Sequence, residues 1–130
     1  MYDPRVEMRI RGGESIVAAD YIELLAERRA WTLRMEAALA GFDALLSPTL
    51  PIVAPRIQPL IDSDEAFFAV NALLLRNPSL VNLLDGCALS LPCHRGGEWP
   101  VGLMVWSTAL QDDRVLAVSL AIERSLRSAA

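Results

Sequence analysis

The stretch "NLLDGCALSLPCH", residues 82 to 94, contains the clearest structural pattern in the chain. It reads as the end of a short helix, a glycine that stops it, and an apolar strand that ends at Pro92. A second apolar run, "VGLMVW" at residues 101–106, follows a polar, glycine-rich loop. Both runs are too short for a helix, so we expect two neighbouring strands, residues 87–92 and 101–106, covered by helices on both sides.

Outward from these strands, the chain alternates helix and strand signals. Most of the expected helices begin at Asp or Asn, because such side chains satisfy the free N–H groups of a first turn. The expected helices cover residues 4–12, 18–40, 64–75, 77–84 and 112–126, with a short strand in "ALLSPTLP" at 44–51 and irregular chain over 52–63. No internal repeat is visible, and the length fits a single domain over residues 1–130. The fold class is therefore α/β, with a partial mixed sheet and covering helices.

In the two strands that follow residue 86, four apolar side chains should lie in one buried sheet. Each belongs to a continuous apolar run with the length of a strand. They are Leu89, Leu91, Leu103 and Val105.

Composition and charge exclude several classes of function. Hydrophobic residues make up 53% of the chain, which fits either a dense core or a surface that lies against a partner. The net charge is −4 and the twelve basic residues, all arginine, are scattered, whereas nucleic-acid binding needs clustered basic side chains.

No apolar run approaches the about 18 residues of a membrane span, and the charged N-terminus lacks the apolar core of a signal peptide. Two cysteines without a disulfide pattern complete the expectation of a cytoplasmic protein that binds neither nucleic acid nor membrane.

Residues suited to catalysis are sparse. His94 is the single histidine, which argues against a histidine-based metal site. The adjacent Cys93 would point to the opposite face of a strand, so we expect no thiol–imidazole pair. The "RGG" stretches at 11–13 and 95–97 read as turns, because neither follows a strand and opens a helix as a phosphate loop does. We therefore expect no catalytic residue, no metal and no cofactor in this chain.

Several motifs in a fixed order resemble the C-terminal portion of the amidase signature family. They are "AADYIELLAERRAW" (18–31), "DALLSPTLP" (43–51), "RNPSLVNLLDGCALSLPC" (76–93), "PVGLMVW" (100–106) and "QDDRVLAVSLAIE" (111–123). The resemblance implies a layered α/β/α fold and hydrolysis of carbon–nitrogen amide bonds by a Ser–cis-Ser–Lys triad. Members of the family include amide hydrolases and the A subunit of the glutamine-dependent tRNA amidotransferase. This chain has no lysine and no Gly/Ser-rich signature stretch, so the resemblance implies a segment whose catalytic half lies elsewhere.

The chain departs from the family pattern at two places. Asp85 and Cys87 stand where the family motif "NLLGLPALSLP" has glycine and proline. In the tRNA amidotransferase, the acidic residue that holds glutamine aligns with Leu75 of this chain, so glutamine recognition is not supported. Other amidases of the family carry Arg-Asn-Thr at this point. The resemblance therefore implies that Arg76 and Asn77 are substrate-binding residues; the alternative for Arg76 is a solvated arginine at a helix end.

Two functions stay open. One is the C-terminal segment of an amidase that works with a missing N-terminal catalytic half. The other is a stand-alone α/β interaction module with an apolar partner-binding face and no catalysis. Arg28 bears on that face, because helical spacing places it within an apolar stripe that includes Leu25 and Met35. It lies at the rim, pairs with an acid, or points into a seam covered by the catalytic half or by a second copy in a homo-oligomer.

Overall fold

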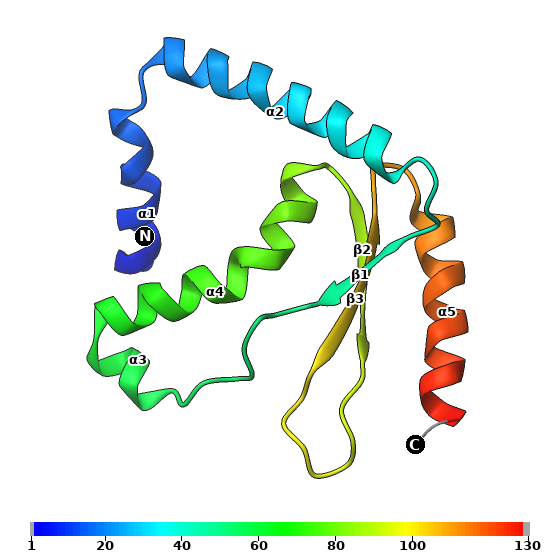
Figure 1. The fold of residues 1–130 in the computed structure, drawn as a ribbon. Helices are drawn as coiled ribbons and strands as arrows, with labels where there is room; N and C mark the ends of the chain where they lie inside the picture. The colour runs from blue at the N-terminus through cyan, green and yellow to red at the C-terminus, as the bar shows by residue number, and fades with distance from the viewer. Residues whose placement is uncertain (1, 129–130) are drawn as a thin grey trace. The chain divides into compact units, whose positions relative to one another are not determined.

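The computed structural model describes residues 2–128, and the chain divides into two compact units, Met1–Arg34 and Met35–Ala130. The first unit contains α1 (Pro4–Arg11), the 3-10 helix η1 (Gly12–Ser15) and most of α2 (Ala18–Leu39) (Figure 1). The start of α1 follows the expected chemistry, because the Asp3 carboxylate accepts a hydrogen bond of 2.9 Å from the backbone N of Arg5. The predicted single domain over residues 1–130 stays a prediction.

No residue of α1 or α2 is buried. Arg28 is half-buried, and it interacts with another group of the chain. Most large apolar side chains of both helices are exposed, including Met8, Ile22 and Leu24. These helices therefore keep their apolar side chains outside the core of the chain.

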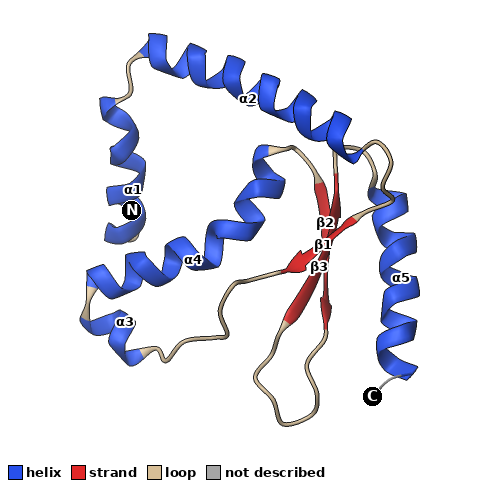
Figure 2. Cartoon of the chain, in the orientation of Figure 1, coloured by secondary structure: helices blue, strands red, loops and turns tan. Residues whose placement is uncertain are grey.

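The second unit is built around a three-stranded sheet in the order β1-β3-β2 (Figure 2). Each neighbouring pair is antiparallel. The elements in chain order are β1 (Leu45–Pro48), α3 (Gln58–Asp62), α4 (Asp64–Leu83), β2 (Cys87–Pro92), β3 (Gly102–Ser107) and α5 (Asp112–Ser128). Figure 1 shows α4 and α5 on opposite sides of this sheet. The α/β class with covering helices is confirmed, but among the described residues the sheet is antiparallel and not mixed as predicted, because these three strands pair only with one another.

The main core lies between the sheet and α5. Leu89 pairs with Val105 and Leu91 with Leu103, so the four residues lie on neighbouring strands of one sheet, as predicted, and their side chains share one face. Leu91, Val105 and Val115 of α5 form the buried centre of this cluster. On the opposite face of β3, Met104 is also buried. The central strand β3 is therefore covered on both faces, whereas Ala88 and Ser90 leave one face of β2 exposed.

The end of α4 makes a tight contact with β3. Val81 and Leu84 are buried here. A side chain at Gly86 would place its Cβ against the backbone oxygen of Ser107, closer than any real Cβ contact. The loop therefore reaches the sheet only because residue 86 has no side chain.

Two sequence predictions about helices are wrong. The predicted helices 64–75 and 77–84 form one continuous helix, α4, with Pro78 inside it. A proline removes one backbone donor and usually bends a helix rather than ending it when packing holds both halves, and α4 is visibly bent (Figure 1). The second error is α3, in a segment predicted to be irregular: its Pro59 lies in the first turn, where a missing N–H costs nothing.

In the part of the chain that is described, no helix is long and apolar enough to cross a membrane.

Candidate functional site

A cavity of about 700 Å³ lies at the end of the sheet where β1 finishes. Its walls are residues 49–55, Leu74 of α4, and the adjoining ends of β2 and β3. The walls are mainly aliphatic side chains and prolines, and the polar side chains that line it belong to Thr49, Ser90 and His94. Among the described residues, no Asp, Glu or Arg contributes to this lining. The cavity is therefore an apolar hollow with few polar side chains.

Two hydroxyl groups form a hydrogen-bonded pair in this cavity. Thr49 Oγ1 and Ser90 Oγ are 2.5 Å apart. The backbone N of Thr49 donates to the Gly102 oxygen at 2.8 Å, which fixes the residue that follows β1 against β3. A Cβ at Gly102 would lie 2.5 Å from Ser90 Oγ and 2.7 Å from Thr49 Oγ1. Glycine at this position makes room for the pair.

His94 is held by Val101, the residue that precedes β3. Its Nδ1 lies 3.4 Å from the backbone N and 3.5 Å from the backbone oxygen of Val101. The Cys93 thiol lies 3.5 Å from the same Val101 oxygen. Both side chains also line a second, smaller cavity of about 400 Å³, beside the Glu123–Arg127 ion pair of α5. Over residues 2–128, no three His, Cys, Asp or Glu side chains gather as a metal site.

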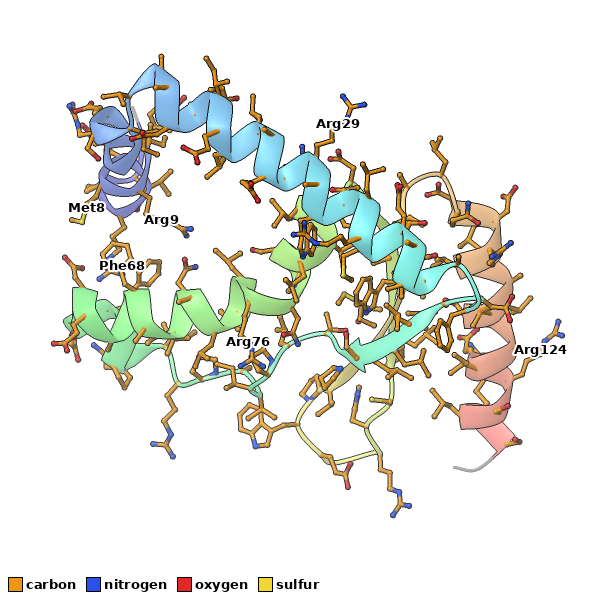
Figure 3. All side chains as sticks on the ribbon, turned by 45° about the horizontal axis from the view of Figure 1, so that its top comes forward. Met8, Arg9, Arg29, Phe68, Arg76 and Arg124 are labelled. Carbon is orange, nitrogen blue, oxygen red and sulfur yellow. The ribbon has the colours of Figure 1, made fainter. Side chains whose placement is uncertain are left out.

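The predicted site residues lie together on α4. The Arg76 Nε donates to the Asn77 Oδ1 at 3.3 Å, and the Asn77 Nδ2 donates to the Pro48 oxygen at 2.8 Å. Arg76 is exposed, and it projects on the side of α4 where the chain leaving β1 runs (Figure 3). Neither residue lines the large cavity. Leu74 does, and Asn77 shares its helix face because the two are three residues apart.

The departure from the family motif at residues 85–87 has a geometric counterpart. Asp85 has a φ of 54°, a left-handed conformation that glycine adopts most readily and that Asp tolerates better than most residues. The following Gly86 makes the close approach to Ser107. Cys87 begins β2, and its thiol lies 3.5 Å from the backbone oxygen of Thr108.

Sequence reasoning missed the Thr49–Ser90 pair and the cavity itself. The two residues are 41 positions apart, and nothing local to either one indicates the other. One signal was present: Pro51, Pro55, Pro92 and Pro100 cluster around the apolar strands, and all four prolines line the cavity.

Comparisons with known proteins agree on one family. The family model described as Amidase matches residues 2–116. A 2-amino-5-chloromuconic acid deaminase of Comamonas testosteroni is 31% identical, over 93% of this chain and 26% of that protein. The A subunit of a glutamyl-tRNA(Gln) amidotransferase from Thermobifida fusca is 32% identical, over 97% of this chain and 26% of that protein.

A solved structure points to the same family. The crystal structure of an amidase superposes with a TM-score of 0.68 and 31% identity, over 90% of this chain and 27% of that one. The chain spans about a quarter of the length of the relatives it matches.

Proposed function

Since this chain belongs to the amidase family, we propose that it is the C-terminal segment of an amide hydrolase and works with catalytic residues carried by the rest of that enzyme. The supporting observation is the match over residues 2–116 to a family whose members here are about four times longer. The reaction we propose for the complete enzyme is hydrolysis of a carbon–nitrogen amide bond. The segment contributes part of the sheet, its covering helices and part of a substrate pocket.

We assign no catalytic residue to this segment. The family's triad needs a lysine and two signature serines, and the chain has no lysine and no Gly/Ser-rich stretch. Without a base beside it, a serine hydroxyl is a weak nucleophile. Nucleophile and base therefore come from the catalytic half, and the segment needs neither a metal nor a cofactor.

Arg76 and Asn77 are our candidates for substrate binding. The Asn77 carboxamide holds the end of β1 through Pro48 and accepts a hydrogen bond from Arg76. Asn77 therefore acts as a positioning residue for the chain segment that walls the cavity. The exposed Arg76 guanidinium offers further donors to a substrate oxygen.

The partner that we propose is the N-terminal catalytic half, with a second copy of the chain as the alternative. The exposed apolar side chains of α1 and α2 support a covering partner. The same observation also supports the second candidate function, a stand-alone interaction module without catalysis. Two free cysteines, Cys87 and Cys93, fit a cytoplasmic location.

A chimeric enzyme tests the proposal. Residues 2–128 replace the matching segment of the Comamonas testosteroni deaminase, and release of ammonia is measured on that enzyme's own substrate. We expect turnover well above a chimera that lacks the segment. The matched control carries the corresponding segment of the Thermobifida fusca amidotransferase, whose similarity to this chain is comparable to that of the deaminase. Activity in the control and none in the test chimera would favour the interaction module.

A further inference from the structure

The smaller cavity, of about 400 Å³, lies between the end of β2 and the last turns of α5. Most of its lining side chains are ionisable, whereas the large cavity is apolar. The lining consists of Pro92, Cys93, His94, Arg95, Glu123, Leu126 and Arg127. We propose that this cavity binds a small disulfide with negatively charged arms, and that Cys93 on its wall exchanges with the ligand to form a mixed disulfide.

The charges of this lining favour an anionic ligand. The Arg127 Nη2 donates to the Glu123 Oε1 at 2.7 Å, so the glutamate holds this guanidinium beside the cavity. Arg95 donates to the Glu98 Oε2 at 2.9 Å through its backbone N and not through its side chain. Both guanidiniums therefore keep donors for a carboxylate, the partner that suits their planar geometry. Two arginines against one glutamate leave the lining with a net positive charge.

Cys93 adds a group that can react with such a ligand. Its side chain is exposed, and its backbone N donates to the Val101 oxygen at 3.0 Å, which fixes the residue where the loop leaves β2. Cys87 is half-buried and lies outside the lining, with its thiol 3.5 Å from the Thr108 oxygen. Because exchange with a disulfide requires access to the sulfur, Cys93 is the cysteine that a ligand in the cavity can reach.

The reaction is an exchange of one sulfur–sulfur bond for another. The thiolate of Cys93 attacks one sulfur of the bound disulfide and forms the mixed disulfide. The bond between the two arms of the ligand breaks, and the released arm leaves as a thiolate that takes up the proton lost by Cys93. Cys93 is oxidised and the sulfur of the released arm is reduced, so the ligand itself is the oxidant. An excess of free thiol reverses the reaction.

The position of the cavity connects this modification to the large cavity. A volume of about 400 Å³ falls within the range of small-molecule pockets, roughly 300–1,000 Å³. Pro92 and His94 line both cavities. An adduct on Cys93 therefore lies beside two residues of the wall of the large cavity, and the redox state of small thiols acts on that wall through Cys93.

Three disulfides of different charge test the proposal. The reduced 130-residue chain is incubated separately with glutathione disulfide, hydroxyethyl disulfide and cystamine, whose arms are anionic, neutral and cationic. The mass of the intact chain measures adduct formation, and peptide mapping identifies the cysteine. Each rate constant is divided by that of the same chain unfolded in urea, which cancels the intrinsic reactivity of the reagent. We expect an adduct at Cys93, with a corrected rate for glutathione disulfide about tenfold or more above that for cystamine.

Variants of the lining should change this preference in opposite directions. A chain with both Arg95→Gln and Arg127→Gln should lose the preference for the anionic disulfide. Glu123→Gln should increase it, because no lining carboxylate then opposes the ligand. The matched control, Arg124→Gln, changes an exposed arginine of α5 outside the lining and should keep the preference of the wild type. Added salt should reduce the preference of the wild type, since it screens the charges.

Three results would overturn the assignment: equal corrected rates for the three disulfides, a preference that survives in the double arginine variant, or adducts that form as fast at Cys87 as at Cys93. If the double variant does not fold, Glu123→Gln still decides, because an unchanged preference in that chain contradicts the role of the lining charges. The readout needs no amide turnover, so an inactive chimera leaves the result intact.

Discussion

The side-chain Nδ2 of Asn77 lies 2.8 Å from the backbone oxygen of Pro48, and this hydrogen bond ties the bend of α4 to the end of β1. The two residues are 29 positions apart in the chain. Pro78, which follows Asn77, lies inside α4. Thr49, which follows Pro48, lines the large cavity. The bond therefore sets where the loop that follows β1 begins.

Asn77→Ala should lower the free energy of unfolding by about 1–2 kcal/mol, because the Pro48 oxygen loses its donor. The midpoint of urea denaturation measures this change. Asn82→Ala is the matched control, an exposed asparagine near the end of the same helix, and should shift the midpoint much less. Equal shifts for the two variants would mean that the bond to Pro48 adds nothing to stability.

Gly86→Ala should destabilise the chain by about 1–3 kcal/mol, since the new methyl group meets the fixed backbone oxygen of Ser107 and has no room to move. Gly96→Ala adds the same methyl group where nothing lies within 4 Å, and should change stability little. Thermal melting of both variants separates a steric cost from a general effect of replacing glycine. A Gly86→Ala chain that melts with the wild type would show that the loop approaches β3 less closely.

The chain by itself should hydrolyse no amide, because it supplies neither the lysine nor the signature serines of the family. The measurement is ammonia release from a panel of aliphatic and aryl amides incubated with purified chain. Ser47→Ala and Cys93→Ala serve as diagnostic variants. Turnover that survives Ser47→Ala and disappears with Cys93→Ala would assign catalysis to the thiol and contradict this prediction.

The chain should self-associate when the catalytic half is absent, through the α2 face that carries Arg28. Apolar residues on that helix, such as Tyr21 and Leu25, are 55% and 44% exposed, and a second copy would cover them. Sedimentation of the wild type beside Arg28→Glu measures the effect, and we expect a concentration-dependent dimer that the substitution weakens. Monomers at high concentration for both proteins would leave Arg28 as a half-buried residue at the edge of the face.

Local patterns predicted most of the fold. Strand β2 follows from a continuous apolar run with the length of a strand. The long helices α2 and α5 follow from apolar residues at helical spacing. The continuity of α4 did not follow, because whether a helix passes through Pro78 depends on contacts made elsewhere, here by Val81 and Leu84 in the core. α3 was missed for a similar reason, since one turn of helix gives almost no periodic signal.

The candidate site was less predictable than the fold. Arg76 and Asn77 came from resemblance to a family motif, and their roles stay a prediction. The bond from Asn77 to Pro48 and the contact between Thr49 and Ser90 join distant parts of the chain. Such contacts depend on strand order, which no single stretch of sequence encodes. The apolar character of the large cavity emerged only once those residues were in one place.

The strand order β1-β3-β2 also carries a consequence for the folding pathway. β2 and β3 are joined directly by the loop over residues 93–101 and continue into α5, so this part closes with less loss of chain entropy than a pairing across several elements. β1 pairs with β3 only across α3, α4 and β2, a contact of high sequence separation that should form late. Pulsed hydrogen exchange should therefore protect Leu89 before Leu46. Because the wall of the large cavity follows β1, this cavity should be complete only after this slowest folding step.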